Sequence, residues 1–90
     1  MGEKEFSKFC KEQIQKYYKE HRNEDMPVED IFVVWFSKTL QNTKGLFSTT
    51  HSGDHTYVEM TYNGDKQELY MDVYDKLLNQ AIPCHLVAKA

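Results

Sequence analysis

Six consecutive large apolar residues, Ile-Phe-Val-Val-Trp-Phe at positions 31–36, constrain this chain more than any other stretch. Successive side chains of a β-strand point to opposite faces, so Trp35 should share a face with Ile31 and Val33. The alternate residues should then line the other face. A strand that is apolar on both faces has to be covered on both. We therefore predict that this strand lies at the centre of the fold.

The composition is that of one folded domain spanning residues 1–90. Of its residues, 40% are hydrophobic and 28% are charged, with both signs mixed, as is typical of a soluble domain. The net charge of −3 disfavours a surface that grips nucleic acid over its whole extent. Cys10 and Cys84 lie far apart in a chain without a signal peptide, which predicts free thiols in a reducing cytoplasm. No stretch is apolar over the length of a membrane span, so we expect no membrane contact.

Residues 3–22 predict a helix that no Gly or Pro interrupts. Its apolar side chains recur at spacings of three and four, the period of one helix face. These side chains are Phe6, Phe9, Cys10, Ile14, Tyr17 and His21. A second row, which is either a solvated surface or a contact for phosphate groups, consists of Lys4, Lys8, Lys11 and Lys19. The acidic connection over residues 23–30 contains Pro27, which stops the helix.

The middle of the chain predicts an antiparallel meander of three to four strands. We place these strands at residues 31–39, 46–50, 56–62 and, in a shorter form, 66–71. The turn over residues 41–45 offers Asn42 and Gly45 for positive φ angles. Asn63-Gly64 is the strongest hairpin signal in the chain, because this pair suits a two-residue type I′ turn.

The last element, over residues 72–81, is either a helix or a continuation of the strand before it. Leu69, Val73 and Leu77 recur at four-residue spacing, which favours a helix over a strand. The tail over residues 84–90 is expected to be extended or loose. The predicted fold class is therefore α+β in the order α-β-β-β-α, with an N-terminal and a C-terminal helix covering an antiparallel sheet.

The phrases at residues 33–42, 44–50, 57–66 and 70–74 resemble a family of small uncharacterised proteins from phages and prophages of Gram-positive bacteria. Trp-x-x-Lys-Thr-Leu-Gln-Asn and Tyr-Asn-Gly-Asp-Lys are the most specific of these phrases. The resemblance covers residues 30–82. It implies an accessory phage protein that acts in the host cytoplasm, and it transfers no catalytic residue.

Residues around the end of the first strand form a candidate recognition patch. A Trp side chain supplies contact area, and Lys and amide side chains supply hydrogen bonds. The alternative is that the Trp belongs to the core and that the polar side chains cap turns. The residues of this patch are Trp35, Lys38, Gln41, Asn42 and Lys44.

Tyrosines with acidic neighbours gather around the second predicted hairpin. Such a surface suits a basic protein partner, or mimics nucleic acid. The alternative is aromatic pairing between adjacent strands, which serves stability alone. The candidate binding residues in this region are Tyr57, Tyr62, Asp65, Tyr70 and Tyr74.

His51, Asp54 and His55 carry side chains that can bind zinc, but their spacing falls in a loop. Only Cys84 and the adjacent His85 supply further ligand types, so we predict a polar loop and no metal site. No nucleophile motif, phosphate-binding loop or dinucleotide fingerprint occurs in the sequence. We therefore expect neither an enzyme nor a cofactor.

The preferred hypothesis is a non-enzymatic phage accessory protein that binds and modulates a host protein. One alternative is a nucleic-acid-binding protein that uses the lysine row of the first helix. Another is a binder of a small anionic ligand, such as a nucleotide, at a dimer interface. The two-sided apolar strand at residues 31–36 also predicts a homodimer, because a second copy could cover its exposed face.

Overall fold

The structure is a computed structural model that describes residues 2–51 and 53–85. Ser52 of the predicted loop and residues 86–90 of the predicted tail lie outside the described residues. In chain order, the elements are α1 (Glu3–Arg22), the short 3-10 helix η1 (Val28–Asp30), β1 (Ile31–Thr39), β2 (Asn42–Thr49), β3 (Thr56–Asn63) and β4 (Glu68–Asp75).

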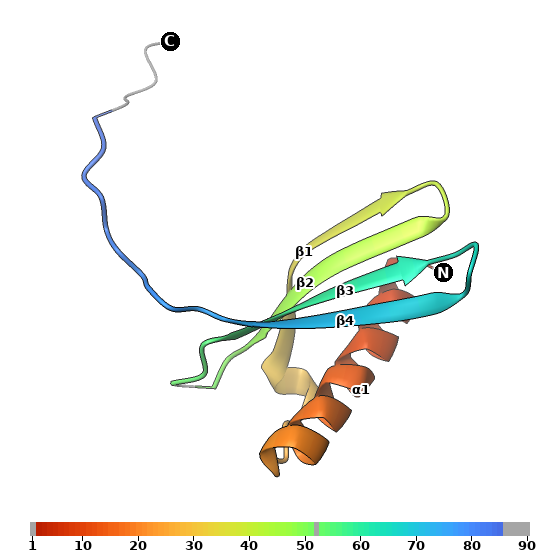
Figure 1. The fold of residues 1–90 in the computed structure, drawn as a ribbon, viewed down its shortest axis with the longest axis horizontal. Helices are drawn as coiled ribbons and strands as arrows, with labels where there is room; N and C mark the ends of the chain where they lie inside the picture. The colour runs from red at the N-terminus through yellow and green to blue at the C-terminus, as the bar shows by residue number, and fades with distance from the viewer. Residues whose placement is uncertain (1, 52, 86–90) are drawn as a thin grey trace.

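The four strands form one antiparallel sheet in the order β1-β2-β3-β4. Each strand therefore pairs with its neighbour in the sequence, and Figure 1 shows α1 lying on one side of this sheet. The predicted α+β class and antiparallel meander are confirmed. No helix in the described part of the chain is long and apolar enough to cross a bilayer.

Helix α1 forms where the sequence predicts it, and both of its ends are stabilised. Acidic residues occupy its first turn and basic residues its last, which suits the helix dipole. Asn23, with a left-handed φ of 51°, caps the C-terminal end through its N–H bond to the carbonyl of Tyr18. Phe9 is 40% exposed, so it is not part of the buried stripe that the spacing predicts.

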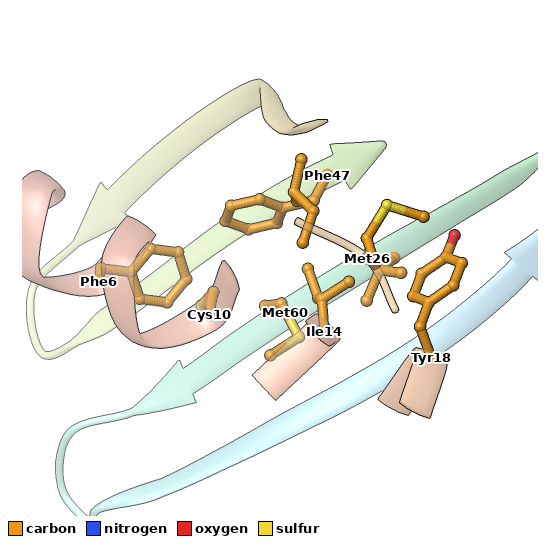
Figure 2. Close-up of a cluster of buried hydrophobic side chains, with 9 residues drawn as sticks. Phe6, Cys10, Ile14, Tyr18, Met26, Phe47 and Met60 are labelled. Carbon is orange, nitrogen blue, oxygen red and sulfur yellow. The ribbon is translucent and has the colours of Figure 1, made fainter. Parts of the chain in front are cut away.

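The core lies between α1 and one face of the sheet (Figure 2). Side chains at four-residue spacing project from the helix into this layer, namely Phe6, Cys10, Ile14 and Tyr18, all at most 1% exposed. They meet the buried Phe47 of β2 and the buried Val58 and Met60 of β3. The Phe6 and Phe47 ring centroids lie 6.3 Å apart in a tilted arrangement, within the range of a favourable aromatic contact.

Strand β1 lies at an edge of the sheet, so its predicted central position is wrong. Only one of its faces is covered, since Ile31 is 1% exposed whereas Phe32 is 42% exposed. A β-bulge between Val33 and Trp35 shifts the register against β2 and places Trp35 opposite Leu46. The extra residue reverses the alternation. Trp35 consequently lies on the face of Phe32 and not, as predicted, on that of Ile31.

The helix predicted over residues 72–81 does not form. Strand β4 continues to Asp75, with Val73 opposite Val58, and residues 76–85 contain neither helix nor strand. Four-residue spacing is also a multiple of the two-residue period of a strand, so it cannot separate the two structures. Backbone hydrogen bonds to β3 hold residues 72–75 in the strand conformation. Residues 76–85 run away from the sheet as an extended arm (Figure 1).

The turn chemistry differs from the prediction in both outer hairpins. Asn42 and Gly45 do not take positive φ angles, and Leu40 does so instead, at 54°. The β3–β4 turn spans residues 64–67 and is therefore not a two-residue type I′ turn. Gly64 is needed for space, because a Cβ there would lie 2.3 Å from the carbonyl oxygen of Gln41.

Gly45 lets α1 approach the sheet, which makes it sensitive to substitution. A Cβ at this position would lie 3.1 Å from a ring carbon of Phe6 and 3.1 Å from one of Phe47. We expect Gly45→Ala to lower the free energy of unfolding by about 1–3 kcal/mol through overpacking. Chemical denaturation measures this loss. In the Phe6→Leu background the same substitution should cost less, and an equal cost in both backgrounds would contradict the proposed clash.

Candidate functional site

The face of the sheet opposite α1 carries an exposed aromatic surface, which we call the open face. Cross-strand pairing shows which residues share it. Trp35 of β1 lies opposite Leu46, Leu46 opposite Glu59, and Glu59 opposite Asp72. In the next row, Ser37, Lys44, Thr61 and Tyr70 lie opposite one another in turn. The face therefore presents side chains from all four strands.

Large side chains on the open face are only partly covered. Phe32 is 42% exposed, Trp35 41%, Tyr70 44% and Tyr74 52%. On the opposite face, Phe47, Val58 and Met60 are each at most 2% exposed. The difference between the two faces is the cover that α1 gives to only one of them.

A hollow of about 410 Å³ lies on the open face, between Trp35 and Tyr70. Its lining comes from all four strands and combines aromatic rings with hydroxyl and amide side chains. The lining residues are Trp35, Ser37, Thr39, Asn42, Lys44, Thr61, Asn63 and Tyr70. Aromatic walls around hydroxyl and amide groups suit recognition by contact and hydrogen bonding.

Charged groups on the open face are partly balanced and leave an acidic side. The ammonium Nζ of Lys44 lies 3.5 Å from Oε2 of Glu59, so the cation in the hollow is paired. Tyr70 donates a hydrogen bond from its hydroxyl to Glu68, and this bond raises the pKa of Tyr70. Glu68 and Asp72 both belong to β4. The acidic character of the face therefore concentrates along this strand.

The structure brings together part of the predicted binding set. Trp35, Asn42, Lys44 and Tyr70 line the same hollow, although Tyr70 was assigned to a different cluster from the other three. Tyr57 and Tyr74 lie opposite each other, and alternation along β3 and β4 places them on the open face as well.

The remaining predicted residues lie elsewhere. Lys38 is opposite the buried Thr43 and so projects on the side of α1. Tyr62 packs against the core. Gln41 lies in the β1–β2 turn, and Asp65 lies in the β3–β4 turn, where its N–H bonds the Asn63 side chain. These residues are therefore not part of the surface that Trp35 defines.

Phe32, Ser37 and Thr39 belong to the open face but are not among the predicted binding residues, although alternation already places Ser37 on the face of Trp35. Thr39 follows Ser37 at the same two-residue spacing, so strand alternation alone could have assigned it to this face. Phe32 could not be assigned in this way. The bulge between Val33 and Trp35 leaves no clear mark in the sequence.

Asp54, one of the considered zinc ligands, instead anchors the β2–β3 loop to α1. Its Oδ2 accepts hydrogen bonds from the Tyr18 hydroxyl and from Thr49 Oγ1, both at 2.6 Å. Its Oδ1 accepts the Thr56 N–H at 3.1 Å and lies 3.6 Å from the Arg22 guanidinium. Burial works to raise the pKa of Asp54, but the hydrogen bonds outweigh it and the pKa falls below its ordinary value.

His51 forms a second link, between the same loop and the segment that joins α1 to β1. Its Nε2 lies 2.8 Å from Asp30 Oδ2, and its Nδ1 lies 3.4 Å from Glu24 Oε2. The hydrogen bond to Asp30 raises the pKa of His51, partial burial opposes this, and Glu24 adds to the increase. Carboxylates near both ring nitrogens therefore favour the protonated form of this imidazole. Among the described residues, no group of three potential ligands could hold a metal ion.

Removing the Asp54 carboxylate should release the loop. We expect Asp54→Ala to lower the free energy of unfolding by about 1.5–3 kcal/mol, because hydrogen bonds to a charged group are lost. Wild-type protein should also lose stability as the pH falls from 3.8 through the lower folded-state pKa. Urea titrations between neutral and acid pH measure both effects. The neighbouring His55→Ala should change stability by less than about 0.5 kcal/mol.

His51 predicts a pH dependence of the opposite sign. Its pKa is higher in the folded protein than the ordinary value of 6.5, so its stabilising effect is complete below that value and is lost as the pH rises through the raised pKa. Melting temperatures recorded across this range should fall for the wild type. The His51→Gln variant should lack this component, while His55→Gln should keep it. An unchanged profile in His51→Gln would contradict the assignment.

One protein family, described as a family of unknown function (DUF6275), matches residues 7–84 of this chain. The match includes most of α1, all four strands and nearly all of the described arm. No curated protein and no solved structure matches the chain.

Proposed function

The chain belongs to the family of unknown function DUF6275, and we propose that it is a non-enzymatic module that binds another protein through its open face. The single observation that carries this proposal is the exposure of large aromatic side chains on one face of the sheet. Trp and Tyr are enriched at the centres of protein interfaces, where they contribute most of the binding energy.

The charge of the open face indicates the chemistry of the partner. Glu68 and Asp72 border the aromatic side chains along β4, and the one lysine of the hollow is paired with Glu59. Charges across an interface are arranged to be complementary. The partner therefore presents an apolar centre with Lys or Arg side chains on the flank that meets β4.

The open face supports a protein partner better than a small anion or nucleic acid. Lys44 is already neutralised by Glu59 at 3.5 Å, so an anion entering the hollow would compete with a carboxylate. On α1, Lys19 is bound to Asp25 at 3.0 Å. This ion pair weakens the case for a continuous phosphate-binding row, since phosphate contacts require available cations.

We place the activity in the cytoplasm of a Gram-positive bacterium, as the product of a phage or prophage gene with a host protein as the partner. The support for this setting is the likeness of residues 30–82 to small phage proteins. A protein that binds and modulates a host factor needs no chemistry of its own. The buried Cys10 agrees with such a role, because burial raises its thiol pKa to about 12 and leaves it un-ionised at neutral pH.

The open face can be tested by affinity capture followed by titration with the purified partner. Wild-type protein and the variants Trp35→Ala and Tyr70→Ala are used to capture proteins from a Gram-positive host lysate. We expect a specific protein to bind the wild type and to lose roughly tenfold or more in affinity with each variant, as truncated interface aromatics do. Isothermal titration calorimetry on the purified pair measures this loss.

Phe9→Ala is the matched control, because Phe9 on α1 is 40% exposed and Trp35 is 41% exposed. This variant should bind as the wild type does. Raising the salt concentration should weaken binding if acidic β4 meets basic groups. The proposal fails if no captured protein depends on Trp35 and Tyr70, or if Phe9→Ala reduces binding equally.

A further inference from the structure

The outer edge of β4 has no neighbouring strand in the sheet, and it is distinct from the open face. We propose that this edge pairs with β4 of a second copy of the chain, antiparallel and around a two-fold axis at Met71. Two four-stranded sheets would then join into one continuous sheet. This inference does not rest on the proposed function, because it involves the backbone edge of the sheet and not its aromatic face.

The face of β4 on the side of α1 is apolar, whereas its open face alternates tyrosines with Glu68 and Asp72. Leu69, Met71 and Val73 project on the side of α1, while Tyr70 and Tyr74 project on the open face. An apolar face of an antiparallel strand is normally covered. Met71 is nevertheless 37% exposed and Val73 36% exposed. A neighbouring strand would cover these side chains.

The two edges of the sheet differ in how they are protected. Exposed edges are normally blocked by bulges, prolines or lysines, which prevent pairing with other chains. β1 has a bulge between Val33 and Trp35 and carries Lys38. β4 has a regular register along its full length, with no proline and no lysine, and its charged residues are the acidic Glu68, Asp72 and Asp75. The edge of β1 is therefore blocked by a distortion of the backbone, whereas the backbone edge of β4 is regular and can pair where its carboxylates do not oppose one another.

A backbone contact identifies which groups of β4 point outward. The N–H of Lys76 bonds the carbonyl of His55 at 2.7 Å, which continues the register in which Thr56 lies opposite Asp75. Hydrogen-bonded pairs recur at every second residue of an antiparallel ladder. Even-numbered residues of β4 thus bond β3. The N–H and C=O groups of Leu69, Met71 and Val73 point away from it.

Charge disfavours the two symmetric registers that neighbour the one centred at Met71. With the axis at Met71, Leu69 lies opposite Val73 of the second copy, and Tyr70 lies opposite Asp72. With the axis at Tyr70, Glu68 would lie opposite Asp72 of the second copy. With the axis at Asp72, the Asp72 carboxylates of the two copies would lie opposite each other. Like charges directly opposite each other destabilise a strand pair. Of these three registers, only the one centred at Met71 opposes no like charges.

Substitution of Met71 tests the pairing. Because the Met71 N–H points outward, Met71→Pro removes an intermolecular donor without breaking the β3–β4 ladder. Met71→Lys leaves the backbone intact and brings two positive charges together at the axis. Sedimentation velocity at tens of micromolar should show a dimer for the wild type and for Met71→Leu. Both disruptive variants should weaken the dimer by roughly tenfold or more.

Cysteine cross-linking tests the register in a Cys84→Ser background, since Cys84 is the exposed thiol. Directly opposite residues in a hydrogen-bonded pair have Cα atoms about 5.5 Å apart, within reach of a disulfide. Met71→Cys should therefore form an intermolecular disulfide faster than Tyr70→Cys or Asp72→Cys.

Each result decides the proposal. Fastest cross-linking at position 71, with circular dichroism showing that the variants remain folded, supports it. A wild type that stays monomeric overturns it, and so does a dimer that is unaffected by Met71→Pro and Met71→Lys. Dimerisation that is lost with Trp35→Ala but not with Met71→Lys would mean that the copies meet through the open face, and would also overturn it.

Discussion

The packing of α1 against one face of the sheet determines which parts of this protein remain available for contacts. The helix presents a single stripe, from Phe6 to Tyr18, and this stripe seals Phe47, Val58 and Met60 from water. Among the described residues there is no second helix for the other face. The same contact that builds the core therefore creates the aromatic open face, and Gly45 sets how closely the two layers meet.

Polar contacts hold this arrangement together at the end of the sheet where α1 finishes. Asp54 gathers Tyr18, Thr49 and Arg22 around one carboxylate. The guanidinium of Arg22 also lies 3.8 Å from Asp75, at the end of β4. The helix terminus, the β2–β3 loop and the last strand are thus joined in one network, which keeps the orientation of the helix across the sheet constant.

The sequence predicted the helix and the strands better than it predicted which elements lie next to one another in the fold. The helix at residues 3–22 and the strands follow from local periodicity, which Phe6, Cys10 and Ile14 or Val58 and Met60 display directly. The edge position of β1 could not be predicted in this way. An apolar run indicates that the strand must be covered, but it does not show which element covers it. The bulge that moved Trp35 depends on pairing with β2. The end of β4 was mistaken for a helix because a spacing of four satisfies both periods. For the candidate site, the sequence grouped Trp35, Asn42 and Lys44, which line one hollow, whereas Tyr70 joins them only through strand order.

The meander has a consequence for how the chain folds. Every strand pair in the sheet is a hairpin between adjacent segments, so these pairs require only short loops to close. Helix α1, in contrast, contacts a loop 36 residues away through Tyr18 and Asp54. We expect the hairpins to assemble early and the helix to dock late. During that interval Phe47 and Met60 face water, and the growing chain is then at its most vulnerable to aggregation.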